Sequence, residues 1–367
     1  MTALSVFCIA VPLIQVIYFL LFFYAFSKKR IKVSVPSIPV SVIVCAQDEE
    51  QNLRELVPLL LEQYHLEFEI IIVEDRSNDN SFEYLLEESR KNPMLRIVRV
   101  DHKPEHVNGK KYALTLGIRA AKFEWILFTD ADCRPSGKHW ITDMVKEAGD
   151  DTKFVLGYSA YKKLPGGLNT FIRFETLLTG IQYIAYALLG RPYMGVGRNL
   201  VYRKSLFLST KGFHPYMDTT GGDDDLFVNQ HATKSNTKVS IGPDSLVYSE
   251  PEKSWEGFYI QKLRHLSVGK YYKFSDKLFL ALFSITWILT TLVVLPAMYF
   301  TPFFYVVLVI LGVRWLIMMS VFYKGSRKLG DRFEAWLVPV LDIIYTFYYL
   351  VTGLVAFTSK NVRWKKS

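Results

Sequence analysis

The 367-residue sequence contains only three cysteines, and they lie far apart. Cys8, Cys45 and Cys133 do not share the short spacings of a zinc site, and they are too few for the disulfide framework of a small secreted domain. Disulfide-rich and zinc-binding classes are therefore excluded. The three thiols fit a reducing compartment such as the cytosol.

The sequence also lacks the glycine-rich motifs that bind phosphate at the start of many α/β domains. Neither Gly-x-Gly-x-x-Gly nor a Walker loop follows the first predicted strand, Val40–Cys45. Those motifs place backbone N–H groups against a dinucleotide or a triphosphate. Their absence removes support for a dinucleotide-binding dehydrogenase or a P-loop NTPase.

Charged residues are sparse in two regions, 1–26 and 278–358, although 22% of the whole sequence is charged. Residues 3–26 exceed the roughly 20 apolar residues that span a bilayer, and Ser27-Lys28-Lys29-Arg30 follows at once. A cleaved signal peptide carries its charge before the apolar core. We therefore expect an uncleaved anchor whose carboxyl end lies in the cytoplasm.

Apolar runs near the other end of the sequence predict further membrane spans. They are Leu278–Phe300, Pro302–Phe322 and Ala335–Phe357. Arg314 lies nine residues before Tyr323, and Asp342 lies eight residues after Glu334, so at about 1.5 Å per residue the two charges have similar depth. A charge at that depth is costly unless it is paired. We therefore predict a contact between Arg314 and Asp342.

The side of the membrane that holds the carboxyl end stays open. Four spans from an outside amino terminus would leave it outside, whereas the basic tail 359–367 favours the inside. Pro339 and Asp342 could break the last apolar run into a re-entrant segment that returns to the cytoplasm. The number of membrane spans is therefore three or four. Much of the net charge of +9 flanks these runs and suits anionic lipid headgroups, so no nucleic-acid partner is expected.

Between the apolar ends, short apolar runs alternate with amphipathic segments. The predicted strands are Val40–Cys45, Phe68–Val73, Leu95–Val100 and Trp125–Phe128, and the predicted helices are Glu49–Gln63, Ser81–Lys91 and Lys110–Ala121. This alternation is typical of βαβ units. The fold class is therefore α/β with a mostly parallel sheet.

Acidic and amide side chains follow three of the predicted strands. They lie in Ala46–Glu50, in Glu74–Asp79 and at Asp130 and Asp132. Ligands of open α/β sheets bind at the carboxyl ends of the strands. Two carboxylates so close repel each other unless a cation such as Mg²⁺ or Mn²⁺ lies between them and holds substrate phosphates. A solvated turn, in which Asp is common, is the alternative.

Asp223, Asp224 and Asp225 begin a predicted helix that runs to His231. One acidic residue there would complement the helix dipole, but three exceed what capping needs. Neighbouring carboxylates raise one another's pKa, which suits a proton acceptor. Further on, Gln261 and Arg264 share one face of a predicted interfacial helix that is rich in aromatic residues.

The order of these motifs resembles the membrane-bound members of glycosyltransferase family 2, which include cellulose, chitin and hyaluronan synthases and lipid-directed sugar transferases. The matching stretches are Ser41–Asn52, Val73–Asp79, Gly109–Leu114, Asp130 with Asp132, Gly222–Leu226 and Gln261–His265. The resemblance implies a GT-A-type fold with transmembrane helices at both ends. The implied segments are an anchor (1–27), a catalytic domain (38–250), an interfacial helix (251–276), terminal transmembrane helices (277–358) and a basic tail (359–367).

The resemblance also implies roles for individual residues. Those implied at the nucleotide sugar are Glu49, Asp75, Lys110, Lys111, Asp130, Gln261 and Arg264. Asp132 and Asp130 match the metal-binding Asp-x-Asp, with Mg²⁺ or Mn²⁺ as the cofactor. The catalytic base is Asp223 when the motif is aligned on Asp225-Leu226, and Asp224 when it is aligned on Gly-Asp-Asp.

The implied function is inverting transfer of a sugar from a nucleoside diphosphate sugar, with UDP as the expected nucleotide. The acceptor would be a hydroxyl of a membrane-associated lipid or glycan. We expect a multi-pass protein of the inner or plasma membrane with a cytoplasmic catalytic domain. The Trp of the synthases' Gln-x-x-Arg-Trp motif is His265 here, which favours single transfer over polymer synthesis. A processive synthase and a non-catalytic scaffold are the alternatives.

Overall fold

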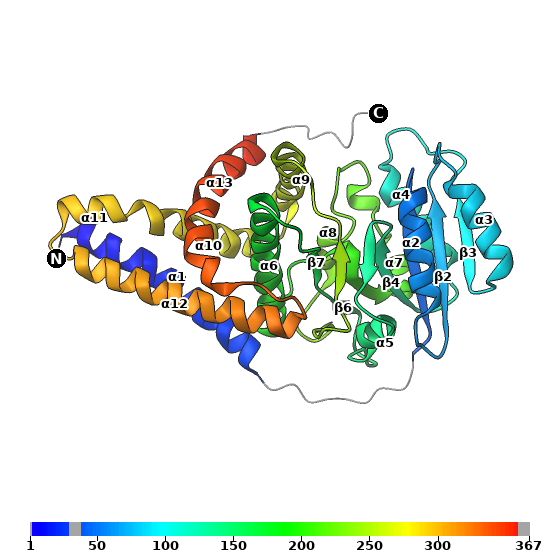
Figure 1. The fold of residues 1–367 in the computed structure, drawn as a ribbon, viewed down its shortest axis with the longest axis horizontal. Helices are drawn as coiled ribbons and strands as arrows, with labels where there is room; N and C mark the ends of the chain where they lie inside the picture. Colours follow the sequence, from blue (N-terminus) through cyan, green and yellow to red (C-terminus); the bar gives the residue numbers. More distant parts are fainter. Residues whose placement is uncertain (1, 29–37, 359–367) are drawn as a thin grey trace. The chain divides into compact units, whose positions relative to one another are not determined.

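The computed structural model describes residues 2–28 and 38–358. The predictions that depend on Lys29, Arg30 and the tail 359–367 concern residues outside this described part. The chain forms two compact units. Unit 1 comprises Met1–Arg30, Lys163–Leu189 and Glu252–Ser367, and unit 2 comprises Ile31–Lys162 and Gly190–Pro251. Figure 1 shows the ribbon, in which most of the helices and some of the strands carry the labels used below.

Unit 2 is built on a mixed sheet that has seven strands within the described residues, in the order β3-β2-β1-β4-β8-β6-β9. The strands are β1 (Val40–Ala46), β2 (Phe68–Glu74), β3 (Leu95–Arg99), β4 (Trp125–Asp130), β6 (Phe154–Leu156), β8 (Leu200–Arg203) and β9 (Thr237–Val239). Strands β3, β2, β1 and β4 are parallel, whereas β8 runs antiparallel to both β4 and β6. Four consecutive strands therefore end at the same edge.

Helices flank these parallel strands, as the alternating sequence pattern predicts. They are α2 (Glu50–Leu61), α3 (Ser81–Lys91) and α4 (Gly109–Ala120), and α5 (Trp140–Val145) follows β4. β2 is buried along its whole length because both faces of the sheet are covered. Gly117 lets α4 pack closely on the sheet, since a Cβ there would lie 2.7 Å from Val73 Cγ2.

A smaller sheet follows the predicted metal-binding segment in sequence. Its strands, β5 (Cys133–Pro135), β10 (Val247–Ser249) and β7 (Ser159–Tyr161), pair in that order. The short elements around it are η1 (Gly197–Asn199), α7 (Lys204–Ser209), η2 (His214–Tyr216) and α8 (Asp225–His231). Strand β10 pairs with residues more than eighty positions earlier, and it brings Ser249 opposite Cys133.

Every secondary-structure element among the described residues of unit 1 is a helix. Its elements are α1 (Ala3–Ser27), α6 (Gly167–Leu188), α9 (Trp255–Val268), η3 (Gly269–Tyr271), α10 (Phe274–Leu292), α11 (Val294–Phe300), α12 (Phe304–Leu329), η4 (Ala335–Leu337) and α13 (Val338–Thr358). Within the described part, four helical segments are long and apolar enough to cross a membrane: Ala3–Ser27, Phe274–Leu292, Phe304–Leu329 and Ala335–Gly353. Helix α6 falls within the predicted domain 38–250 but packs with α1, α12 and α13 in unit 1.

The predicted contact between Arg314 and Asp342 is confirmed. The Arg314 guanidinium donates two hydrogen bonds to the Asp342 carboxylate, at 2.6 and 2.9 Å, and both side chains are buried. Trp315 Nε1 donates a third hydrogen bond to the same carboxylate, at 2.8 Å. The pair joins α12 to α13 inside the apolar helices.

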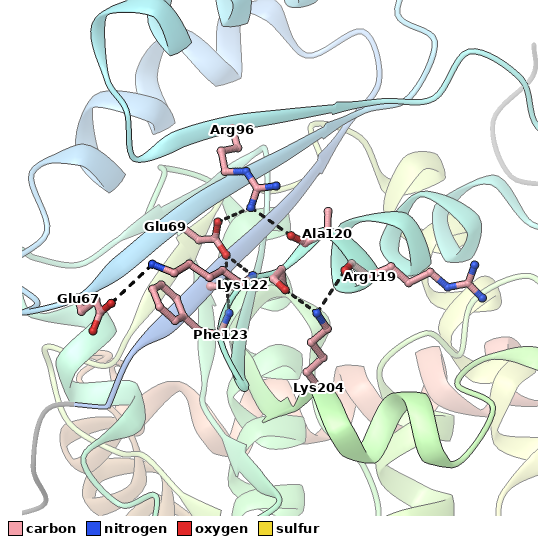
Figure 2. A network of polar contacts seen from close by, with 10 residues as sticks. Glu67, Glu69, Arg96, Arg119, Ala120, Lys122, Phe123 and Lys204 are labelled. Carbon is pink, nitrogen blue, oxygen red and sulfur yellow. Dashed lines mark hydrogen bonds and ion pairs between the residues drawn. The ribbon is translucent and has the colours of Figure 1, made fainter.

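A polar network fixes the end of unit 2 at which strands β1 and β2 begin (Figure 2). Glu69 accepts hydrogen bonds from Ser41 Oγ (2.7 Å), the Lys122 backbone N–H (2.5 Å) and Arg96 (2.7 Å). Lys204 donates to the carbonyl oxygens of Arg119 and Ala121, where α4 ends. These contacts satisfy backbone groups that a helix end would otherwise leave unpaired.

Candidate active site

A pocket lies in unit 2 where β1 and β4 end. Residues of β1, α4, β4, η1, β8 and the segment before α8 line it: Cys45, Lys110, Leu114, Phe128, Thr129, Asp130, Gly197, Leu200, Tyr202, Asp223 and Asp224. The parallel pairing of β1 and β4 aligns Cys45 with Asp130, so both strands deliver side chains to the same edge. The first turn of α4 delivers Lys110.

Lys110 joins carboxylates that are distant in sequence. Its Nζ donates to Asp130 Oδ1 at 3.0 Å and lies 3.6 Å from Asp223 Oδ2. Burial alone would lower the pKa of this lysine, but the charges of Asp130, Asp223 and Asp224 outweigh it and raise the pKa well above its usual value. The end of β4 and the acidic triplet therefore share one charged centre.

Asp223 and Asp224 differ in how their carboxylates are used. Asp224 accepts backbone hydrogen bonds on both oxygens, from Gly197 N–H at 2.6 Å and from Asp225 N–H at 2.7 Å. Burial, together with the charge of Asp223, raises the pKa of Asp224 to about 6. The Asp223 carboxylate lies near Lys110, and no hydrogen bond engages it within the described residues. Asp224 thus ties η1 to α8, and Asp223 remains available to a ligand.

Lys111, the next residue after Lys110, is fully buried. Its Nζ donates to the carbonyl oxygens of Tyr216 and Thr219, both at 2.6 Å. Burial lowers the pKa of Lys111 to about 8. Its ammonium is therefore committed to the loop that precedes the acidic triplet. Of the two lysines predicted at the nucleotide, only Lys110 lines the pocket.

Asp132 Oδ2 accepts a hydrogen bond from Ser249 Oγ at 3.1 Å. Among the residues that the structure describes, no three His, Cys, Asp or Glu side chains converge as a complete metal cage. Mg²⁺ commonly takes one or two protein carboxylates, and substrate phosphates and water complete its shell. The oxygen donors of Asp130 and Asp132 fit that kind of site.

The remaining predicted donor-site residues of unit 2 lie where β1 and β2 end. The Asp75 backbone N–H donates to Ala46 O, and the Asp75 carboxylate accepts from Arg76 Nε at 2.8 Å. Asp75 also lies beside the start of α4, because a Cβ on Gly109 would be 3.4 Å from Asp75 Oδ2. Glu49 precedes α2 and accepts from Asn52 Nδ2 at 2.6 Å.

Gln261 and Arg264 belong to α9 in unit 1. Ser254 caps the start of this helix, because its Oγ accepts the Gly257 N–H at 3.1 Å. Both residues fall within this one helix, as the sequence indicates. Their role at the nucleotide sugar stays a prediction.

Sequence reasoning missed two polar residues at this centre. Thr129 Oγ1 is buried in the pocket wall without a hydrogen-bond partner among the described residues. Arg198, in η1, places its guanidinium 4.8 Å from the centre of the Tyr161 ring. The signal that could have revealed Arg198 is its position in a glycine-rich turn that opens a strand, Gly195 to Arg203.

Two family models match the chain. Glycosyl transferase family 2 matches residues 41–208, and Glycosyl transferase family group 2 matches residues 125–355, which is more than half of the chain. An uncharacterized glycosyltransferase of Synechocystis sp. is 30% identical over 119 residues, which cover 31% of this chain and 36% of that protein. Glycosyltransferase GlyG of Streptococcus pneumoniae serotype 4 is 35% identical over 97 residues, which cover 25% of this chain and 30% of that protein. The matched stretches thus span about a third of each relative.

Among solved structures, the mannosyltransferase PcManGT from Pyrobaculum calidifontis, in complex with GDP-Man and Mn²⁺, has a similar fold. Its TM-score is 0.59 over 98% of both chains, at 16% identity. The likeness confirms the predicted GT-A-type fold with apolar helices at both ends. The match of Glycosyl transferase family group 2 to more than half of the chain shows that the chain belongs to that family.

Proposed function

We propose that this protein is an inverting glycosyltransferase that moves a sugar from a nucleoside diphosphate sugar to a hydroxyl of a membrane-associated acceptor. The observation that carries the proposal is the meeting of Asp130 and Asp223 at Lys110, in one pocket at the carboxyl ends of the parallel strands. Family membership and the GDP-Man and Mn²⁺ in the PcManGT complex support a nucleoside diphosphate sugar and a divalent cation. UDP and GDP are the first nucleotides to test.

Asp223 is the proposed catalytic base. Its carboxylate lines the pocket, and its one ion pair among the described residues is with Lys110. The carboxylate takes the proton of the acceptor hydroxyl while that oxygen attacks the anomeric carbon and the bond to the diphosphate breaks. Asp224 is a positioning residue, because two backbone hydrogen bonds hold its carboxylate.

Asp132, with Asp130 beside it, would hold Mg²⁺ or Mn²⁺ at the end of β4. When bound, the cation neutralises negative charge on the diphosphate. Lys110 adds a fixed positive charge from the first turn of α4. Glu49 and Asp75 would contact the nucleotide. Gln261 and Arg264, on α9, stay predicted donor-binding residues because of their sequence motif.

We propose that the four long apolar helices hold the protein in the inner or plasma membrane and that the catalytic unit faces the cytoplasm. Helix α1 has a mean hydropathy of 2.6, and Lys28 follows its last residue. Basic residues next to a span favour the cytoplasmic side. The acceptor would then be a lipid or a lipid-linked glycan that presents its hydroxyl at the membrane surface.

The proposal is tested by incubating the purified full-length protein with a panel of nucleotide sugars and a membrane lipid extract. Release of nucleoside diphosphate is measured with Mn²⁺ and after chelation. Asp223→Asn should lower the rate about 10²- to 10⁴-fold, the usual contribution of a general base, while UDP or GDP binding persists. Asp224→Asn should keep more activity, since its amide can still accept one backbone hydrogen bond.

Three results would change this assignment. Loss of turnover in Asp224→Asn but not in Asp223→Asn would move the base to Asp224. Donor binding without turnover on any acceptor would favour a non-catalytic scaffold. Long products, seen by mass spectrometry, would favour a processive synthase.

A further inference from the structure

Arg198 is a cation beside the acidic centre whose guanidinium has no hydrogen-bond acceptor within the described residues. It lies over the Tyr161 ring, and no ion pair engages it in that part of the chain. Burial alone would lower its pKa, but Tyr161, Cys133, Asp132 and Asp130 outweigh burial and raise it. Tyr161 also pairs with Ser249 in the smaller sheet, and Ser249 Oγ donates to Asp132 Oδ2 at 3.1 Å. These contacts place the guanidinium beside the end of β4, with five N–H donors to offer.

Other cations near these strand ends are already committed. Lys110 donates to Asp130, and Lys111 donates to two backbone carbonyl oxygens. Arg134, which follows Asp132 by two residues, donates to Glu55 and Asn52 and to the carbonyl oxygens of Ala131 and Cys133. Arg198 differs from all of these in its unused donors. An anionic ligand could therefore bind it without breaking an existing ion pair.

The backbone that carries Arg198 is held on both sides. Before it, Gly197 N–H donates to Asp224. After it, the fully buried Asn199 donates through Nδ2 to the carbonyl oxygens of Tyr158 and Ser245, both at 2.7 Å. Asn199 Oδ1 also accepts from Trp140 Nε1 at 3.0 Å. Such anchoring lowers the entropy that is lost when the guanidinium binds a ligand.

We propose that Arg198 binds the diphosphate of the donor, next to the cation site at Asp132. This inference rests on the proposed function. A diphosphate that approaches Asp130, Asp132 and Asp223 is repelled unless positive charge faces it, and a planar guanidinium matches two phosphate oxygens at once. Arg198 would also stabilise the charge that develops on the departing diphosphate.

The test measures binding of UDP, GDP and uridine to the full-length protein by calorimetry in the presence of Mn²⁺. Arg198→Gln should weaken binding of the diphosphate about 10- to 100-fold, because a hydrogen bond to a charged group contributes about 1.5 to 3 kcal/mol. Binding of uridine, which has no phosphate, should not change. Arg198→Lys keeps the positive charge but loses the planar guanidinium that can contact two phosphate oxygens. Its affinity for the diphosphate should lie between those of the unaltered protein and Arg198→Gln.

Arg203→Gln is the matched control. Arg203 follows Arg198 by five residues, and it donates to the carbonyl oxygens of Thr152 and Asp150, each at 2.7 Å. This variant should lower the melting temperature and keep the affinity for the diphosphate. Melting curves of all variants show whether they are folded. If Arg198→Gln is unfolded, the binding test uses Arg198→Lys instead.

Equal diphosphate affinity in the Arg198 variants and the unaltered protein would overturn the proposal. An equal loss for uridine and for the diphosphate would also overturn it, because it would indicate a general change in the pocket. If the unaltered protein bound neither UDP nor GDP, the proposed function itself would fail, and this inference would fail with it.

Discussion

Lys110 and Lys111 are adjacent in sequence, but their side chains contact different parts of unit 2. On a helix, successive residues point about 100° apart, so only one of two neighbours can face a given pocket. Lys110 reaches Asp130, whereas Lys111 reaches the carbonyl oxygens of Tyr216 and Thr219. The sequence motif could not distinguish them, because the loop that Lys111 contacts lies more than a hundred positions away.

The pocket carboxylates predict an acid limit to activity. Burial and the charge of Asp223 raise the pKa of Asp224 to about 6, so Asp224 binds a proton below that pH. A protonated Asp224 would weaken the backbone hydrogen bonds from Gly197 and Asp225 that position the acidic triplet, so kcat/KM should fall as the pH is lowered through about 6. Nucleoside diphosphate release measured between pH 5 and 8 checks this.

The variant Lys110→Gln tests in which direction this acid limit moves. The positive charge of Lys110 lowers the pKa of Asp224, and its removal should move the acid limit to a higher pH. A rate that stays constant down to pH 5, or a limit that moves to a lower pH in Lys110→Gln, would contradict the assignment.

At the scale of elements, the Glu69 network predicts where the sheet is most sensitive (Figure 2). Burial would raise the pKa of Glu69, but hydrogen bonds from Ser41, the Lys122 backbone and Arg96 outweigh burial and lower it below 4.5. Glu69→Ala should reduce the free energy of unfolding by about 1.5 to 3 kcal/mol, the range for hydrogen bonds to charged groups. Thermal unfolding of the full-length protein measures the loss.

The pH dependence follows from the direction of that shift. Because the folded pKa is lowered, the stabilisation is present above about 4.5 and is lost as the pH falls below it. Glu67→Ala is the control, since its pair with Lys122 spans 3.8 Å between exposed side chains and should contribute less than about 1 kcal/mol. An equal effect of Glu67→Ala and Glu69→Ala would refute the network's role.

The first half of unit 2 could be predicted from sequence because each element signals itself locally. Helix α3 has the predicted bounds, Ser81–Lys91, and β1, β2 and β4 each begin at the predicted residue. The later strands β5, β7 and β10 have three residues each, too few for a period, and their pairing depends on contacts distant in sequence. Their register could not be predicted, so the position of Asp132 beside Ser249 was not foreseen.

At the scale of the whole molecule, the buried pair of Arg314 and Asp342 predicts a test for unit 1. Removing one partner leaves an unpaired buried charge, which typically costs about 3 to 5 kcal/mol. Arg314→Met and Asp342→Leu should each lower the melting temperature in detergent, and the double variant should lower it less than either. If each single variant lowered the melting temperature no more than the double variant does, the two residues would not be coupled.

Depth along a helix made this contact predictable, because charge is scarce in the apolar runs and each charged side chain needs a partner. The acidic centre was only partly predictable. Its residue types were evident from Asp130, Asp132 and the Asp223–Asp225 triplet, but their division of labour depends on the backbone N–H groups that hold Asp224. A sequence motif does not show which backbone N–H groups will bind a side chain.

The anchoring of Lys111 has a consequence for protein engineering. Its ammonium binds the carbonyl oxygens of Tyr216 and Thr219 and so holds the segment before the acidic triplet against α4. This segment therefore cannot be exchanged independently of α4. A chimera that imports the segment from a relative with a different backbone path would leave a buried lysine facing no acceptor. Exchanges intended to alter acceptor choice should therefore graft the start of α4 and residues 214–225 together.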